Sequence, residues 1–154
     1  MKRFGNTLIS VVFLLSMLIF SAPAIASEDT IYTQITSEQL ASIMQSYGWQ
    51  VDDGSWGGVS WTIDDTWATL FLYDNGKAIQ FYKYVTGVRY SLWELNEWNR
   101  DHRYSRTYLD RDGDPVIELD LDLSGGVTEA RIVDWLKTCH VSLLYWYWTI
   151  VGAG

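Results

Sequence analysis

The sequence predicts an α+β domain in which a twisted, mostly antiparallel sheet is flanked by three helices, in the order α-β-β-β-β-α-β-β-α. Helix-capping patterns followed by helical apolar spacing alternate with stretches that have the two-residue period of strands. Helices and strands do not alternate strictly, as they would in a parallel βαβ fold. The length after a predicted leader suits one domain, and we expect residues 27–154 to form it.

The first two helices are predicted by capping boxes, in which a Ser or Thr is followed three residues later by Gln or Glu. Apolar residues then recur at helical spacing, which predicts helices over about 37–47 and 92–100. We expect Trp93 and Trp98 of the second helix to lie in the core. The two capping boxes are Thr36 with Gln39, and Ser91 with Glu94.

Thr128 is expected to cap a third helix, whose apolar stripe runs to Cys139. The segment that follows, 141–151, is almost wholly apolar and rich in aromatics. As a helix its eleven residues would extend about 16 Å, and a bilayer core of about 30 Å is too thick for it to span. We rank three uses for it: covering an aromatic sheet face, pairing with a second chain, and lying on a membrane surface.

The strongest turn signal is Asn75-Gly76, which predicts a two-residue hairpin loop between strands at 67–73 and 77–85. This turn places Leu72 opposite Ile79. The other face of the hairpin is also apolar, although an antiparallel hairpin usually has one polar face. A helix, another chain or a ligand should therefore cover the second face, which contains Trp67, Phe71, Tyr73, Tyr82 and Tyr84.

A second hairpin is predicted from strands at 103–109 and 116–123, and its second strand alternates apolar and acidic residues. A turn centred on Asp112 sets Arg106 opposite Glu118, an oppositely charged cross-strand pair. The acidic stripe of Glu118, Asp120 and Asp122 is interpreted as a solvated strand face. Shorter strands are expected near 49–51 and 59–62.

Residues 1–26 have the pattern of a secretory signal peptide: a basic start, an apolar stretch of 13 residues and a small-x-small site at Ala24-Ile25-Ala26. We therefore expect a periplasmic or secreted protein. Removing this segment leaves nine basic against 19 acidic residues, a formal charge of −10. This charge argues against nucleic acid as a partner. Cys139 is the only cysteine, so no disulfide can form within the chain, and we expect the thiol to be buried.

No catalytic residue, cofactor or metal ligand set is predicted. Asp110, Asp112 and Asp114 have the alternate spacing that calcium favours, but an EF-hand loop counted from Asp110 would place Pro115 where Gly is needed and Leu121 where Glu is needed. A hairpin turn is favoured over a cation site there. The two histidines have no Cys or His partner at zinc-binding spacing, and no nucleophile elbow is present.

One ordered run of residues carries a family resemblance: Asn96, Trp98, Asn99, Arg100, Tyr108, Asp110, Asp112, Gly113, Asp114 and Pro115, followed by an acidic strand and Gly125-Gly126-Val127-Thr128. Through these residues the sequence between about 35 and 140 resembles the YbjN family, whose name describes a bacterial sensory transduction regulator. The resemblance implies a fold similar to that of type III secretion chaperones, which are often dimeric, and a non-catalytic regulatory or chaperone-like role.

The leading functional hypothesis is an exported binding or regulatory module that contacts a polypeptide partner or a second copy of itself. Trp56, on a Gly-rich loop, could fold onto the sheet or cap a pocket. One alternative is a peripheral membrane protein that uses residues 141–151, and another is a carboxylate-based metal-binding protein. The candidate binding residues are Trp56, Trp67, Phe71, Tyr73, Tyr82 and Tyr84.

Overall fold

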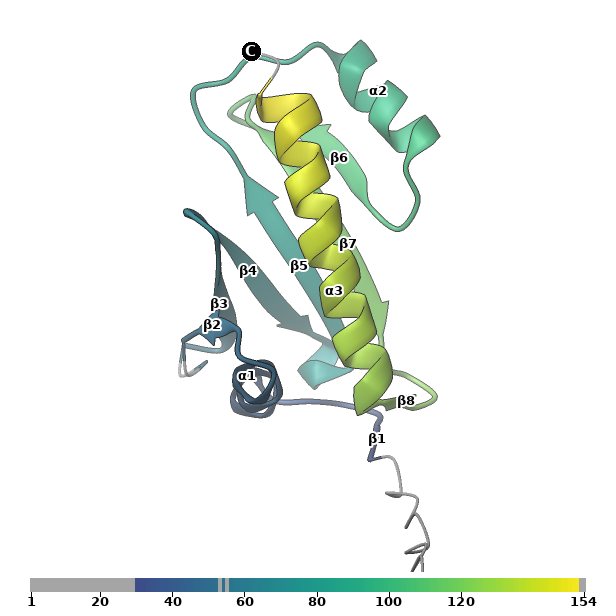
Figure 1. Cartoon of the computed structure of the whole chain (residues 1–154). Coiled ribbons are helices and arrows are strands. Elements are labelled where there is room, and N and C mark those ends of the chain that lie inside the picture. Colours follow the sequence, from purple (N-terminus) through teal and green to yellow (C-terminus); the bar gives the residue numbers. More distant parts are fainter. Residues whose placement is uncertain (1–29, 53, 55, 153–154) are drawn as a thin grey trace, which may run out of the picture.

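A computed structural model describes residues 30–52, 54 and 56–152, so the predicted leader lies outside the described residues. Its main feature is a six-stranded antiparallel sheet with the strand order β2-β3-β4-β5-β7-β6 (Figure 1). The predicted α+β class and element order are confirmed. The strands are β2 (Gln50–Val51), β3 (Gly58–Ile63), β4 (Thr66–Tyr73), β5 (Ala78–Tyr84), β6 (Arg106–Leu109) and β7 (Pro115–Asp122).

The three predicted helices are present as α1 (Ser37–Ser46), α2 (Leu92–Asp101) and α3 (Glu129–Trp146). Both capping boxes form, and Thr128 caps α3 by accepting a hydrogen bond from the backbone N–H of Arg131. The chain then continues into a π-helical turn, η2 (Tyr147–Val151). A small second sheet, which the sequence did not predict, pairs β1 (Ile31–Tyr32) with β8 (Val127–Thr128).

The hairpin of β4 and β5 has the predicted register, because Leu72 pairs with Ile79. Its turn, η1 (Asp74–Gly76), has positive φ at Asp74, Asn75 and Gly76. Gly76 also receives a hydrogen bond of 2.9 Å from the backbone N–H of Ile35. A Cβ at Gly76 would collide with the Ile35 carbonyl, so the segment before α1 is fixed to this turn only because the residue is glycine.

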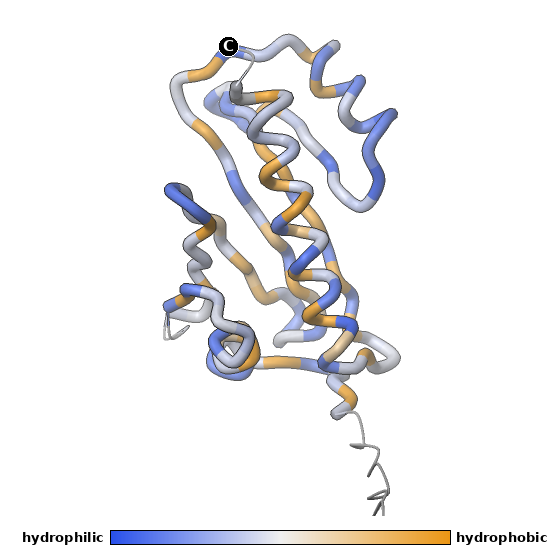
Figure 2. Tube along the Cα trace, in the orientation of Figure 1, coloured by the Kyte–Doolittle hydropathy of each residue, from blue (hydrophilic) through white to orange (hydrophobic). Residues whose placement is uncertain are grey.

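The hydrophobic core lies between one face of the sheet, here called the inner face, and helices α1 and α3. Figure 2 shows hydrophobic residues recurring along α3 and along the strands behind it. Cys139 is fully buried in this core, as expected. Inner-face residues of the core include Val59, Trp61, Leu70, Ile79, Phe81, Ile117 and Leu119, and α3 contributes Ile132, Leu136, Leu143 and Trp146.

The expectation that the C-terminal segment covers the aromatic face of the hairpin is wrong. The ring of His140 on α3 lies 5.8 Å from that of Trp61, and the indole N–H of Trp146 donates to the hydroxyl of Thr107. Trp61 and Thr107 both belong to the inner face, where they alternate with outward-pointing neighbours. Both faces of the hairpin are apolar, so hydrophobic patterning alone could not show which one the helix would cover.

Two further expectations need correction near α2. The strand before the second turn begins at Arg106 and not at Arg103, because Tyr104 has a φ of 69° that interrupts the extended chain. Trp93 was expected in the core, but it is 68% exposed. Trp93 lies near the start of α2, away from the side on which Leu95 and Trp98 are buried.

Candidate functional site

The side of the six-stranded sheet opposite the inner face carries a row of aromatic rings that no described helix covers. We call it the outer sheet face. Trp67, Tyr73 and Tyr108 on it are exposed, and its other rings are half-buried. Five of the predicted binding residues are therefore brought together on one surface. Its aromatic residues are Trp67, Phe71 and Tyr73 of β4, Tyr82 and Tyr84 of β5, and Tyr108 of β6.

These rings contact one another in a continuous series across β4 and β5. Trp67 lies 5.9 Å from Tyr84 between ring centroids, Tyr84 lies 6.0 Å from Tyr82, and Tyr82 lies 5.7 Å from Phe71. Phe71 in turn lies 6.3 Å from Tyr73. Inclined and edge-to-face arrangements at such distances are favourable for aromatic pairs. The surface is thus held in shape by its own side chains.

Trp56 folds onto this face, which was one of the two uses considered for it. Its indole N–H donates to the carboxylate of Asp52 at 2.6 Å, and that carboxylate also accepts from the backbone N–H of Gly54 at 3.0 Å. The ring lies over Gly58, where a Cβ would overlap it, and Gly58 pairs with Phe71. Trp56 remains 52% exposed and extends the aromatic surface toward β3.

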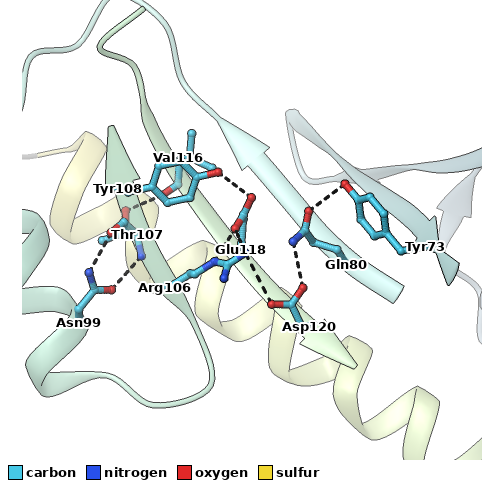
Figure 3. Close-up of polar contacts among 9 residues, drawn as sticks. All are labelled: Tyr73, Gln80, Asn99, Arg106, Thr107, Tyr108, Val116, Glu118 and Asp120. Carbon is cyan, nitrogen blue, oxygen red and sulfur yellow. Dashed lines mark hydrogen bonds and ion pairs between the residues drawn. The ribbon is translucent and has the colours of Figure 1, made fainter. Parts of the chain in front are cut away.

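A chain of polar side chains crosses the outer sheet face beside the rings (Figure 3). The hydroxyl of Tyr73 donates to the side-chain oxygen of Gln80 at 3.3 Å, and the Gln80 amide nitrogen donates to Asp120 at 2.9 Å. The guanidinium of Arg106 lies 3.8 Å from the Asp120 carboxylate and forms a closer ion pair with Glu118. This chain connects β4, β5, β7 and β6, so it fixes their side chains relative to one another.

Glu118 is the buried member of this chain, with only 5% of its surface exposed. The interpretation of the acidic stripe as a solvated face is therefore wrong at this position. Arg106 pairs with Glu118 across the strands, as the register predicted, and the Tyr108 hydroxyl donates to the same carboxylate at 2.7 Å. Burial, together with the hydrogen bond to Glu118, raises the pKa of Tyr108. The Glu118 hydrogen bond also raises the pKa of Arg106.

A second polar cluster, centred on Thr107, holds the helices to the edge of the sheet. The Thr107 hydroxyl donates to the carbonyl of Val116 at 2.6 Å and accepts from the indole N–H of Trp146 at 3.0 Å. The backbone of Thr107 exchanges two hydrogen bonds of 2.8 Å with the side-chain amide of Asn99. One threonine thus connects β7, α3 and α2 to β6.

The residues 110–115 form the predicted turn. One carboxylate oxygen of Asp110 accepts from the backbone N–H groups of Asp112 and Asp114, each at 2.9 Å, and Gly113 has a φ of 85°. Pro115 begins β7, where its carbonyl accepts from the backbone N–H of Val85 at 3.1 Å. Within 30–52, 54 and 56–152, no three His, Cys, Asp or Glu side chains are grouped so that they could hold a metal ion.

The motif residues on α2 have mainly architectural contacts. The Trp98 indole N–H donates to the Ser105 hydroxyl at 3.1 Å, and the ring stacks on His102. Arg100 makes exposed ion pairs with Glu97 and Asp101, whereas Asn96 lies at the surface. Tyr108 is the motif residue that reaches the outer sheet face. The motif therefore builds the α2–β6–β7 support and contributes little of the aromatic surface itself.

Sequence reasoning did not single out Thr107, Trp146 or Gln80 as parts of these clusters. Gln80 and Asp120 pair between β5 and β7, which belong to different hairpins, so neither predicted turn could have placed them side by side. No local signal connects Thr107 with Trp146, which lie 39 residues apart.

The arrangement of sheet and helices resembles that of a type III secretion chaperone. The chain is similar to the Yersinia pestis type III secretion chaperone SycH, whose crystal structure was determined in complex with a stable fragment of YscM2. The match has a TM-score of 0.52 and 14% sequence identity, and it covers 71% of this chain and 97% of that chain.

Residues 36–140 match the family described as "YbjN: Putative bacterial sensory transduction regulator", and the chain therefore belongs to the YbjN family. A comparison with curated proteins found no match. Neither the family's description nor that of the matching chaperone names a catalytic activity.

Proposed function

We propose that this protein is an exported, non-catalytic binding module that contacts a polypeptide partner through the outer sheet face. The observation that carries the proposal is the series of aromatic rings from Trp67 to Tyr73, which no described helix covers. Export is proposed from the pattern of residues 1–26. The similarity to SycH, which was solved with a protein fragment bound, supports a protein partner in general.

The residue types on the outer sheet face suit contact with a protein better than catalysis. Tyr, Trp, Phe and Arg are the residue types enriched in protein interfaces. Tyrosine and tryptophan also supply a large contact area at a small cost in side-chain entropy. The ionisable groups at the centre, Arg106, Glu118 and Tyr108, already bind one another, which makes them poor acids or bases for a reaction.

A different polypeptide is favoured over a second copy. The predicted mature chain has a formal charge of −10, so two copies repel each other at long range. Sedimentation of the purified protein provides the check, because a concentration-dependent dimer that dissociates when Phe71 is changed to Ser would assign the face to self-association. A monomer leaves the face free for another polypeptide.

The proposal is tested by co-purification from the exported fraction with a tagged chain. Phe71→Ser and Tyr82→Ser each reduce the aromatic area of the outer sheet face. Tyr104→Ser is the matched control, since Tyr104 is 76% exposed and is not a strand residue. We expect a specific protein to co-purify with the wild type and the control but to be lost with both face variants. Equal recovery with all four proteins would contradict the proposal.

A second candidate function, contact with a membrane surface, is favoured by one observation. Val141, Tyr145 and Trp148 are 68%, 54% and 79% exposed, and their spacing places them on one side of α3 and η2. The described helices include none with the length and hydropathy needed to cross a membrane. Tyr and Trp suit the interface of a bilayer.

Flotation with neutral phosphatidylcholine vesicles tests this candidate, since no basic residue follows His140 that would favour anionic lipid. Trp148→Ser should reduce flotation if the surface contacts lipid. Trp93→Ser is the control, because Trp93 is similarly exposed but lies on α2. Identical flotation of the wild type and Trp148→Ser would exclude this use of the segment.

A further inference from the structure

Lys83 occupies an unusual position at the end of β5. It pairs with Ile117 and alternates with Phe81 and Ile79, which places the start of its side chain on the apolar inner face. Only 5% of the residue is exposed. The long side chain nevertheless reaches Trp67, and its ammonium nitrogen lies 4.4 Å from the centroid of the Trp67 ring.

This reach is possible because β4 and β5 separate at this end. Their pairing stops at Thr69 and Tyr82. Beyond that point β4 continues to Thr66 beside β3 alone, while β5 continues to Tyr84 beside β7 alone. Figure 1 shows the two strands diverging away from the η1 turn. The Lys83 side chain crosses this divergence and brings a positive charge to the tryptophan end of the outer sheet face.

The Lys83 charge is poorly compensated within the described chain. The other charged side chains of the described strands, Arg106, Glu118, Asp120 and Asp122, each have an ion pair or a hydrogen bond. Lys83 has a cation–π contact with Trp67, which offsets only part of the cost of removing an ammonium group from water. Burial accordingly lowers the pKa of Lys83.

The ammonium nitrogen lies against a ring that is itself exposed. Trp67 is 45% exposed, and the nitrogen is 4.4 Å from the centroid of its ring. A group that packs beside the Trp67 ring therefore comes close to the charge of Lys83.

We propose that the Lys83 ammonium, held against the Trp67 ring, binds a carboxylate of the polypeptide that occupies the outer sheet face. The inference rests on the proposed function and adds the charge and orientation of the bound segment. Its aromatic or aliphatic side chains pack along Phe71 and Tyr82, and its carboxylate lies at the Trp67 end. The carboxylate belongs to an Asp or Glu side chain or to the carboxyl end of the segment.

The acidic side chains at the centre of the outer sheet face are already bound to other groups. Arg106 and Tyr108 already bind Glu118, and Gln80 with Arg106 binds Asp120. Charges in solution beyond about 8 Å are largely screened at physiological salt, so only close charges matter for contact. Lys83 is the cation in contact with the Trp67 ring, while the nearby carboxylates belong to the two turns at this end of the sheet, Asp64 and Asp65 in one and Asp110 and Asp114 in the other.

The test uses the full-length exported protein and a library of random linear peptides displayed with free carboxyl ends. Peptides are selected on the wild type, synthesised, and measured by fluorescence anisotropy. Each is also made with its acidic residue changed to the corresponding amide, and with its carboxyl end amidated, which distinguishes the two sources of carboxylate. Binding is compared among wild type, Lys83→Met, Lys83→Arg and Phe71→Ser, after urea unfolding has shown that each variant is folded.

We expect removal of one carboxylate to weaken binding to the wild type by roughly tenfold or more. The same removal should have little effect on Lys83→Met and a large effect on Lys83→Arg, which retains the charge. Equal losses for the wild type and Lys83→Met would overturn the role of Lys83, while the proposed function would stand if binding still required Phe71. Peptides that bind Phe71→Ser as tightly as the wild type would overturn both.

Discussion

The side-chain amide of Asn99 on α2 pairs with the backbone of Thr107 on β6 as a neighbouring strand would. Its nitrogen donates to the Thr107 carbonyl and its oxygen accepts from the Thr107 N–H, each at 2.8 Å. β6 is the last strand of the sheet, so these two backbone groups would otherwise be unpaired at an open edge. Exposed strand edges favour unwanted pairing with other chains. Asn99 therefore both anchors α2 and blocks the edge of β6.

The loss of this pair should destabilise the protein. Asn99→Ala removes two hydrogen bonds and leaves the Thr107 backbone groups to solvent, with an expected cost of about 1–3 kcal/mol in the free energy of unfolding. Urea unfolding measures it. Asn96→Ala is the matched control, because Asn96 lies on the surface of the same helix and should cost under about 0.5 kcal/mol. Equal effects of the two substitutions would show that the Asn99–Thr107 pair is not stabilising.

The Thr107 hydroxyl should contribute separately. Thr107→Val keeps the shape of the side chain but leaves the Trp146 indole N–H and the Val116 carbonyl without their buried partner. A buried unpaired polar group costs about 1–3 kcal/mol, and thermal unfolding should show the loss. Thr138→Val is the control, since the Thr138 hydroxyl bonds only to the exposed helix backbone at Asp134. An unchanged melting temperature for Thr107→Val would show that this hydroxyl does not stabilise the contact between β6 and α3.

The carboxylate of Asp110 should stabilise the 110–115 turn through its hydrogen bonds, and we expect no cation to bind there. Asp110→Ala removes the acceptor for two backbone N–H groups and should cost about 1–2 kcal/mol, whereas Asp112→Ala, whose side chain has no such role, should be nearly neutral. The melting temperature of the wild type should stay unchanged in millimolar calcium. A rise would show binding to the native state and would revive the metal-binding alternative.

Lys83 should make stability depend on pH in a defined direction. Burial lowers its pKa from the ordinary value of 10.5, so the unfolded chain binds more protons than the folded one between the lowered pKa and 10.5. Stability contributed by this group therefore rises with pH through that interval, and the cost of the buried charge is fully present below it. Lys83→Met should be at least as stable as wild type near pH 7, and its advantage should shrink at high pH.

The measurement is the free energy of unfolding of the wild type and of Lys83→Met at neutral and alkaline pH. The difference between the two proteins cancels the contribution of other titrating groups. The raised pKa of Tyr108 acts in the opposite direction at high pH but is common to both. A variant that is less stable than wild type at pH 7, or a difference that does not change with pH, would contradict the burial of an uncompensated charge.

The sequence predicted the strand registers well because short turns determine them. Asn75-Gly76 set Leu72 opposite Ile79, and the turn around Asp112 set Arg106 opposite Glu118. The capping boxes located α1 and α2 for the same reason, since each depends on residues only three positions apart. Local chemistry of this kind can be read directly from one sequence.

Which face of the sheet α3 packs against could not be predicted in this way. Both faces of the β4–β5 hairpin are apolar, and the position of α3 depends on contacts between residues far apart in the sequence, such as Trp146 with Thr107. The burial of Glu118 also required three side chains from two strands to meet. The burial of Lys83 could not be predicted either, because a lysine in an alternating strand usually lies on the solvated face.

The central claim, that the outer sheet face contacts another polypeptide, is tested most directly by photo-crosslinking in cells that produce the full-length chain. Tyr73 on the face and Tyr104, which precedes β6 and is not one of the aromatic residues of the face, are each replaced by p-benzoylphenylalanine, since both side chains are exposed. We predict a crosslinked product with a different protein from position 73 and none from position 104. The absence of any product at position 73, equal products at both positions, or a product only between two copies of this chain would contradict the claim.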